Sequence, residues 1–178
     1  AKMIIGRDTR VSGEMLEAAL AAGITSVGVS VERLGVIPTP GVAYLVRELQ
    51  ADGGGMISAS HNPVPDNGIK FFLGNGYKLP DEIENEIEAL LNSLELPRPT
   101  GTAVGRITER MDAAELYSNY LKQTIQERLT GLKIVVDCGY GASYYVAPAI
   151  YRALGAEVIA LHAENDGCRI NVDCGSTH

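Results

Sequence analysis

Several features are scarce or missing in this chain, and each absence excludes a class of protein. No apolar run approaches the roughly 18 residues that a membrane-spanning helix needs, and no charged-then-apolar leader precedes Met3. The formal net charge of −7 argues against nucleic acid, because binding to a phosphate backbone requires a basic field. We therefore expect a cytoplasmic protein with no membrane and no nucleic acid among its partners.

Cysteines are also few, and their spacing is uninformative. Cys138, Cys168 and Cys174 are odd in number and include no Cys-x-x-Cys pair. Reduced thiols in a cytoplasmic protein are the simplest interpretation, which disfavours both disulfides and a zinc site. The chain is, however, rich in apolar residues: 46% of its 178 residues are hydrophobic. That is enough to bury a core, in one large domain or in one domain and part of another.

Short apolar runs alternate with helical segments along the first half of the chain. Strands are predicted at residues 4–7, 27–31 and 54–58, and helices at residues 14–22 and 42–50. Ser12 is the expected N-cap of the first helix and Gly23 its expected end. This alternation predicts an α/β fold, specifically a three-layer α/β/α sandwich with a mixed, mostly parallel sheet.

The next expected element is a hairpin at residues 69–79, which would form the antiparallel edge of the sheet. Further elements are an acidic helix at 80–93, a linker at 96–102, a long helix at 113–129 that Gly131 ends, and a β-α-β unit at 132–138, 142–154 and 157–161. We predict a first domain over residues 1–104 and the beginning of a second, similar domain over residues 105–178.

Reactive side chains gather where the third predicted strand ends, in Met56-Ile-Ser-Ala-Ser-His-Asn-Pro63. Ser60 is the candidate nucleophile, although a serine hydroxyl needs a positioned base or a metal to react. Pro63 closes a rigid junction that keeps this serine in place. Ser58 lies on the same side of the strand and is expected to line the site. The alternative is that both serines only cap a turn.

Three neighbours of Ser60 are candidates for handling charge. His61 and Asn62 are expected to hold a phosphate, although a histidine at a strand end is often only structural. Lys70 follows the turn Asp66-Asn67-Gly68 and can neutralise charge or shuttle a proton during phosphoryl transfer. The alternative for Lys70 is a lysine that extends along the surface.

Two arginines flank Asp8 in the loop before the first helix. Arg7 and Arg10 can each bind phosphate oxygens through two nitrogens, helped by the helix N-terminus. Alternatively, Asp8 holds them in a plain ion pair. Elsewhere, the sequence around Gly139 is interpreted as a tight strand-to-helix turn, and the isolated carboxylates Asp137 and Asp173 carry no catalytic prediction.

These motifs resemble the phosphohexomutases, enzymes that move phosphate between C6 and C1 of a sugar through a serine-bound phosphate. The run from Ile57 to Pro63 is similar to their phosphoserine loop, and its Ser-Ala-Ser lead-in resembles the branch that acts on glucosamine phosphates. Other matching motifs are Gly6-Arg-Asp-Thr-Arg10, Ser12-Gly-Glu-Met-Leu-Glu17, Gly35-Val-Ile-Pro-Thr-Pro-Gly-Val-Ala-Tyr44 and Asp66-Asn-Gly-Ile-Lys-Phe-Phe72. The match runs from Ile4 to His178.

The resemblance implies specific roles. Ser60 would carry the phosphate and Lys70 would be the general acid/base. Arg10 resembles the family's active-site arginine more than Arg7 does. A magnesium ion is implied, bound by the phosphate on Ser60 and by three aspartates of a loop that is not in this sequence. The implied substrate is a sugar phosphate, with glucosamine 1,6-bisphosphate or glucose 1,6-bisphosphate as activator.

Family members have an earlier glycine-rich loop and later metal, sugar-reading and phosphate-binding parts that this sequence lacks. The chain therefore resembles most of a first domain and the opening of a second, and we expect it to bind magnesium poorly and to be inactive alone. Exposed apolar surface would then make a homo-oligomer possible. The implied reaction interconverts glucosamine 6-phosphate and glucosamine 1-phosphate. Alternatives are a phosphoglucomutase or phosphomannomutase, and a non-catalytic truncated domain.

Overall fold

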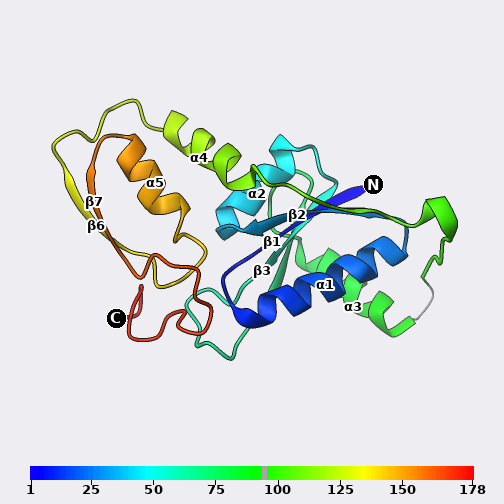
Figure 1. Cartoon of the computed structure of the whole chain (residues 1–178). Helices are drawn as coiled ribbons and strands as arrows, with labels where there is room; N and C mark the ends of the chain where they lie inside the picture. The colour runs from blue at the N-terminus through cyan, green and yellow to red at the C-terminus, as the bar shows by residue number, and fades with distance from the viewer. Residues whose placement is uncertain (94–95) are drawn as a thin grey trace.

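The computed structural model describes residues 1–93 and 96–178 and is built around a five-stranded sheet (Figure 1). The strand order is β4-β3-β1-β2-β5, with β4 antiparallel to β3 and every other pair parallel. The strands are β1 (Lys2–Arg7), β2 (Ser30–Val36), β3 (Gly53–Ile57), β4 (Ile69–Leu73) and β5 (Ile107–Glu109). The mixed, mostly parallel sheet of the sequence prediction is confirmed.

Helices cover both faces of this sheet. They are α1 (Val11–Ser26), α2 (Thr39–Glu48), α3 (Asp81–Ser93) and α4 (Ala113–Gln123). Successive residues of β1 point to opposite faces, so Ile4 packs with Val42 of α2 while Ile5 packs with Ala21 of α1. The α/β/α layering follows from this alternation.

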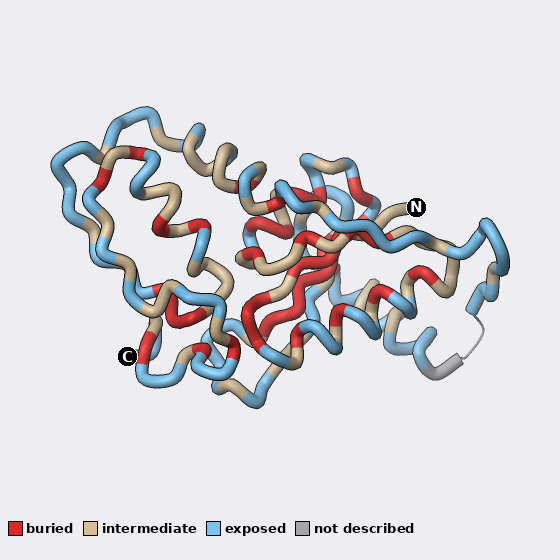
Figure 2. The backbone as a smooth tube through the Cα atoms, in the orientation of Figure 1, coloured by how far each residue is buried: buried red, intermediate tan, exposed pale blue. Residues whose placement is uncertain are grey.

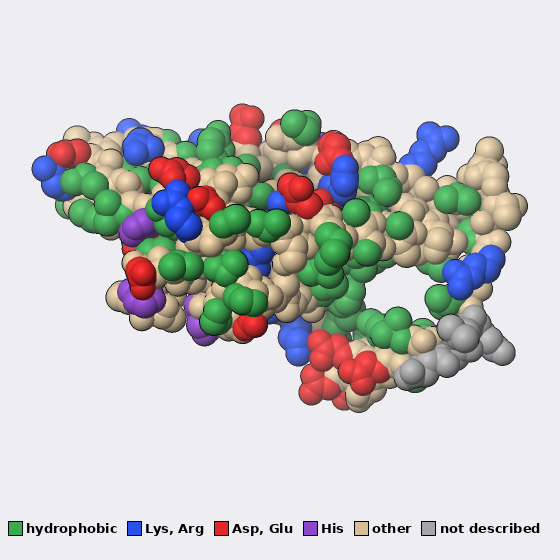
Figure 3. Space-filling model, turned by 60° about the horizontal axis from the view of Figure 1, so that its bottom comes forward, with side chains coloured by type: hydrophobic (Ala, Val, Ile, Leu, Met, Phe, Trp, Pro, Cys, Tyr) green, Lys and Arg blue, Asp and Glu red, His purple; other side chains and the backbone are tan. Residues whose placement is uncertain are grey.

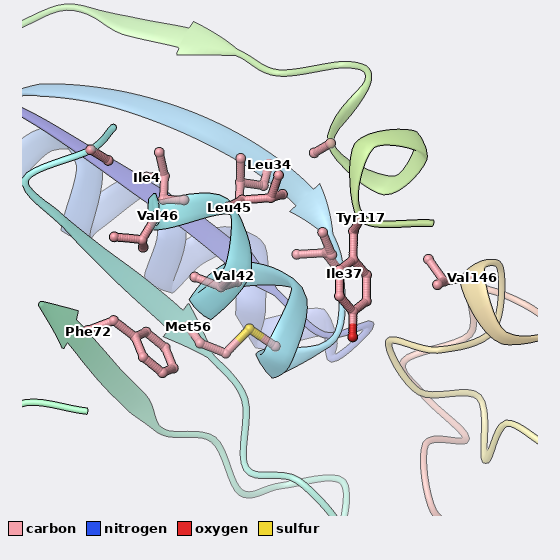
Figure 4. Close-up of a cluster of buried hydrophobic side chains, with 12 residues drawn as sticks. Ile4, Leu34, Ile37, Val42, Leu45, Val46, Met56, Phe72, Tyr117 and Val146 are labelled. Atoms are coloured by element: carbon pink, nitrogen blue, oxygen red, sulfur yellow. The ribbon is translucent and has the colours of Figure 1, made fainter. Parts of the chain in front are cut away.

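The larger core lies on the α2 side and continues into the second part of the chain (Figure 4). Ile37, Leu45 and Val46 are fully buried there. Tyr117 of α4 and Val146 of α5 (Val146–Ala153) belong to the same cluster; in the close-up Tyr117 lies beside Ile37, and Val146 lies beyond Tyr117. Burying each such side chain contributes about 1.5–3 kcal/mol, so this shared core holds the two parts of the chain together.

A smaller β-α-β unit follows. It consists of β6 (Lys133–Asp137), α5 (Val146–Ala153) and β7 (Glu157–Leu161), with β6 and β7 parallel. Burial alternates along both strands because α5 covers only one face (Figure 2). The open face exposes Val135 and Ile159.

Only part of the predicted element pattern holds. The acidic helix and the strand 157–161 are confirmed, as α3 and β7. The predicted ends of α1 are wrong: Arg10 is its N-cap, Ser12 and Gly23 lie inside it, and the turn comes at Gly28, whose φ is +90°. Gly23 does not end the helix, because Gly28 beyond it has the positive φ that commonly terminates a helix.

Three further boundaries differ from the prediction. The second strand begins at Ser30 rather than at residue 27, and α4 ends at Gln123 rather than at residue 129. The return arm of the hairpin is a single bridge between Phe72 and Lys78. Tertiary contacts set these ends. The Leu129 N–H, for example, donates to the Leu154 carbonyl instead of to a carbonyl of its own helix.

The connection between the two parts includes a short 3₁₀-helix, Gly101–Ala103. Beyond it, β5 pairs with β2, so the break between the two sheets comes after Glu109. The proposed division at residues 104/105 therefore does not coincide with that break. In the described part of the chain no helix is long and apolar enough to cross a membrane.

Candidate active site

The candidate nucleophile lies in an exposed loop at the carboxyl end of β3. Ser60 is exposed and has a φ of 57°, in the left-handed region that non-glycine residues rarely adopt. Its N–H donates to the Ser58 hydroxyl at 3.0 Å, and the Ser58 N–H donates to the Gly68 carbonyl at 2.8 Å. The loop between the two strands is thus closed at its base, with Ser60 presented to solvent.

Ser58 supports the loop from within. It is buried, and its hydroxyl donates to Asp8 Oδ2 at 2.7 Å while accepting the Ser60 N–H. Asp8 is equally buried and also accepts the Arg10 N–H and Nε. The Ser58 hydroxyl is thus engaged by Asp8 and by the Ser60 N–H, and its predicted contact with substrate stays a prediction.

Arg10 is surrounded by the backbone carbonyls of the Ser60 loop. Its side chain is 1% exposed, and its nitrogens donate to Asp8 and to the backbone carbonyls of Ser60, Asn62, Pro63, Val64 and Asp66. A guanidinium has five N–H donors, and these acceptors use all of them. A direct contact of Arg10 with phosphate stays a prediction. Arg10 positions the loop.

The other predicted residues around Ser60 are exposed. His61 Nδ1 lies 3.5 Å from Ser60 Oγ, at the outer limit of a hydrogen bond. Asn62 donates through Nδ2 to Asp66 Oδ2 at 3.1 Å. Lys70 pairs with Met56 across β3 and β4, which places it beside the strand that leads into Ser60. The sequence thus correctly predicted that a hydroxyl, an imidazole and an amine share one end of neighbouring strands.

Arg7 is held away from this loop by two carboxylates. Its Nη2 lies 3.1 Å from Glu14 Oε1, and its Nε lies 3.4 Å from Glu17 Oε2. Glu17 is buried, and that burial raises its pKa more than the neighbouring Arg7 lowers it. Arg7 lines a cleft of about 320 Å³ with residues 165–168, so a phosphate role for Arg7 stays a prediction.

A loop of the second unit completes the surroundings of Ser60. A cleft of about 220 Å³ is lined by Ser60 and His61 on one side and by Asp137, Gly139 and Asn171 on the other. Asn171 Nδ2 donates to the carbonyls of Ser60 and Asn62 at 2.9 and 3.1 Å. Figure 3 shows histidine side chains gathered at this end of the molecule.

Asp137 organises the far wall of that cleft. Its carboxylate accepts the N–H of Gly139 at 2.8 Å and of Gly175 at 3.0 Å, and His162 Nδ1 lies 3.0 Å away. Burial acts to raise the pKa of Asp137, but these backbone donors and His162 outweigh it and hold the pKa below its ordinary value. Asp137 is thus a structural anion that ties two loops to the end of β6.

The same place contains the one group of potential metal ligands in the described residues: Asp137, His162 and Cys174, whose donor atoms lie within 4.8 Å of one another. Magnesium prefers an octahedron of oxygens, whereas this set offers one nitrogen and one sulfur, and Asp137 already accepts two N–H groups. These residues do not fit magnesium. Ser60 is the remaining candidate ligand among the predicted site residues.

We expect protonation of Asp137 to loosen this wall, at a pH below the one at which an ordinary aspartate titrates. A carboxyl whose folded pKa is depressed stabilises the fold above its unfolded pKa, near 4, and loses that contribution as pH falls through its folded pKa. Asp137→Asn should therefore be less stable than the parent at neutral pH, with the difference shrinking below about pH 4. Urea unfolding between pH 3 and pH 7 measures this, and a difference that is constant with pH would contradict it.

Sequence reasoning missed two residues of this site. No feature of the sequence singled out Asn171, and Asp137 was expected to be isolated. In the structure Asn171 and Asp173 both have positive φ, which Asn and Asp tolerate better than other side chains. Nothing in the local sequence, however, indicates that Asn171 reaches a loop 111 residues away.

Comparisons of sequence agree with these motifs. The family described as "Phosphoglucomutase/phosphomannomutase, alpha/beta/alpha domain I" matches residues 1–98. A curated protein of Desulforamulus reducens named phosphoglucosamine mutase is 62% identical over 99% of this chain and 40% of its own length. One of Carboxydothermus hydrogenoformans with the same name is 57% identical over 99% of this chain and 40% of its own length. The chain thus spans about 40% of the length of these relatives.

Solved structures show the same fold. A phosphoglucomutase/phosphomannomutase family protein from Burkholderia thailandensis superposes with a TM-score of 0.80 at 27% identity, over 94% of this chain and 37% of its own. A putative phosphomannomutase from Thermus thermophilus gives a TM-score of 0.78 at 28% identity, over 94% of this chain and 38% of its own. Both similarities extend through the second unit.

Proposed function

Because the chain belongs to the phosphoglucomutase/phosphomannomutase family, we propose that it forms the nucleophile-bearing part of an enzyme that interconverts glucosamine 6-phosphate and glucosamine 1-phosphate. The observation that carries this proposal is the exposed Ser60, presented at a strand end by a loop that Arg10 holds rigid. Identity of 55–62% to relatives named phosphoglucosamine mutase supports the choice of sugar.

In the proposed reaction, a phosphate on Ser60 Oγ passes to a sugar hydroxyl. The Oγ–P bond breaks as the sugar O–P bond forms, and the proton of the hydroxyl leaves to a base. The resulting bisphosphate then returns its other phosphate to Ser60. Rigid placement matters because transfer depends on positioning and charge neutralisation more than on covalent chemistry by the protein.

Three side chains are proposed to assist. His61, at 3.5 Å from Ser60 Oγ, would hold the serine-bound phosphate or its proton. Lys70, exposed beside β3, would act as the general acid/base and offset phosphate charge. Asn62 would donate to phosphate once its amide leaves Asp66. Arg10 is a positioning residue in this proposal.

Magnesium and a sugar bisphosphate activator are proposed for the whole enzyme. Magnesium would neutralise charge as the phosphate moves between oxygens. Since this chain contributes only the phosphate on Ser60 to such a site, we expect titration of the chain alone with magnesium to give no clear heat signal. Sugar phosphates are the proposed partners. A homo-oligomer formed through the open face of β6 and β7 stays a prediction.

The proposal is tested on a protein of the relatives' full length whose first part is this chain. After incubation with glucose 1,6-bisphosphate, intact mass and peptide fragmentation should show one phosphate, located on Ser60. Ser60→Ala should carry none and should lose at least about 10⁴-fold in mutase rate, because the covalent route is removed. A phosphate on another residue, or turnover retained by Ser60→Ala, would refute the assignment.

A second sugar class is favoured by the names of the matching family and of the solved structures, which refer to phosphoglucomutase and phosphomannomutase. Rates with glucosamine 6-phosphate, glucose 6-phosphate and mannose 6-phosphate, measured side by side on the same full-length protein, separate the two. A kcat/KM larger for glucose or mannose phosphate than for glucosamine phosphate would replace the proposed substrate.

A further inference from the structure

Two carbonyls of the Ser60 loop are held from both parts of the chain. Arg10 Nη2 donates to the carbonyls of Ser60 and Asn62 at 3.0 and 2.8 Å, from the first sheet. Asn171 Nδ2 donates to the same two carbonyls at 2.9 and 3.1 Å, from the second unit. A carbonyl oxygen has two lone pairs, so both acceptors are fully used.

This double contact falls where the backbone most needs support. Ser60 has a φ of 57°, a conformation that persists only where the surrounding structure over-determines it. Arg10 is buried and supplies one side of that support. The other side depends on a side chain that is distant in sequence and lies in the loop after β7.

Asn171 is itself tied to the end of β6. Its own N–H donates to the Gly139 carbonyl at 3.0 Å, and Asp137 accepts the N–H groups of Gly139 and Gly175. Asn171 has a φ of 60°, which asparagine tolerates while also offering an amide donor. A movement of β6 relative to the first sheet would therefore displace Asn171, and with it the donor to the Ser60 carbonyl.

We propose that Asn171 is a positioning residue that makes the geometry of Ser60 depend on the placement of the second unit. The importance of that geometry rests on the proposed function of Ser60. When the loop at residues 171–175 is seated, Ser60 is held from two sides. When that loop moves away, the Ser60 and Asn62 carbonyls keep only the Arg10 contact and the nucleophile loop loosens.

The first test is amide hydrogen exchange on the 178-residue chain, followed by mass spectrometry. The reporters are the N–H groups of Ser60 and Asn62, which bond to Ser58 Oγ and the Ala59 carbonyl. Asn171→Gly and Asn171→Asp both remove the donor and tolerate positive φ. Each should speed exchange at the reporters by about 5- to 100-fold, as expected for losing two hydrogen bonds.

Asp173→Asn is the matched control. Asp173 has a φ of 50° in the same loop, is exposed, and has no hydrogen bond in the described set to the Ser60 loop. Its replacement should leave exchange at Ser60 and Asn62 within about twofold of the parent. Unchanged exchange in both Asn171 variants would overturn the proposal. So would equal acceleration throughout β6 and α5, since that would mean general loosening of the second unit.

The second test is the rate of phosphate transfer from glucose 1,6-bisphosphate to Ser60 in the full-length protein. Asn171→Gly should lower this rate while Asp173→Asn should not. Transfer in the parent but an unchanged rate in Asn171→Gly would overturn the positioning role in catalysis. If the parent itself transfers no phosphate, the proposed function fails, and hydrogen exchange still decides whether Asn171 controls the loop.

Discussion

Replacing Arg10 with methionine should destabilise the protein by about 3–5 kcal/mol, because it removes one partner of a buried ion pair. Arg10 is 1% exposed and its Nε lies 3.1 Å from Asp8 Oδ2. Methionine fills a similar volume but leaves the Asp8 charge buried without its cation and removes one donor from each of five loop carbonyls, of which those of Ser60 and Asn62 keep Asn171. Urea unfolding followed by circular dichroism measures this loss, which is a large share of a typical domain's stability.

A second substitution separates the two parts of that effect. Asp8→Asn in the Arg10→Met background removes the unpaired buried charge, so it should recover part of the lost stability. It should not return amide exchange in the Ser60 loop to the rate of the parent, because the loop carbonyls still lack the Arg10 donors. Arg106→Met, at an exposed arginine, is the matched control and should change stability by less than about 0.5 kcal/mol. An Arg10→Met protein as stable as this control would refute the role given to Arg10.

Gly167→Ala should separate the two loops that meet beside Arg10. A Cβ at position 167 would lie 1.9 Å from the Thr9 carbonyl oxygen and 2.9 Å from the Arg10 Cα, distances that force the backbone to move. Overpacking of this kind costs about 1–3 kcal/mol, and more where backbone meets backbone. The shift should also break the 2.5 Å hydrogen bond from Thr9 Oγ1 to the Tyr140 carbonyl.

Gly23→Ala is the matched comparison for Gly167→Ala. Gly23 lies inside α1, and a Cβ there meets no atom within 4 Å. Alanine should therefore raise the free energy of unfolding by about 0.4–1 kcal/mol, because it restricts the unfolded chain and favours the helix. Thermal unfolding should therefore give a midpoint below that of the parent for Gly167→Ala and above it for Gly23→Ala. Equal midpoints would show that the approach of residue 167 to Thr9 is not tight in solution.

Local sequence was enough to predict the chemistry of the Ser60 end of the sheet. Ser60 and His61 follow β3, and Lys70 begins β4 next to it, because an apolar run, a turn sequence and a second apolar run specify adjacent antiparallel strands. The same reasoning did not predict the surroundings of Arg10. A charged residue beside a predicted site suggests phosphate binding, whereas only three-dimensional packing shows that the loop carbonyls surround its guanidinium.

The sequence by itself determined the α/β alternation, the acidic α3 and the position of Ser60 at a strand end, because each depends on residues within about ten positions of one another. Tertiary structure decided that β5 joins the first sheet, that Asp137 anchors two loops and that Asn171 contacts the Ser60 loop. These features depend on which distant segments meet at one edge of the fold. That meeting follows from burial of the shared core around Tyr117 and Val146, which no local pattern records.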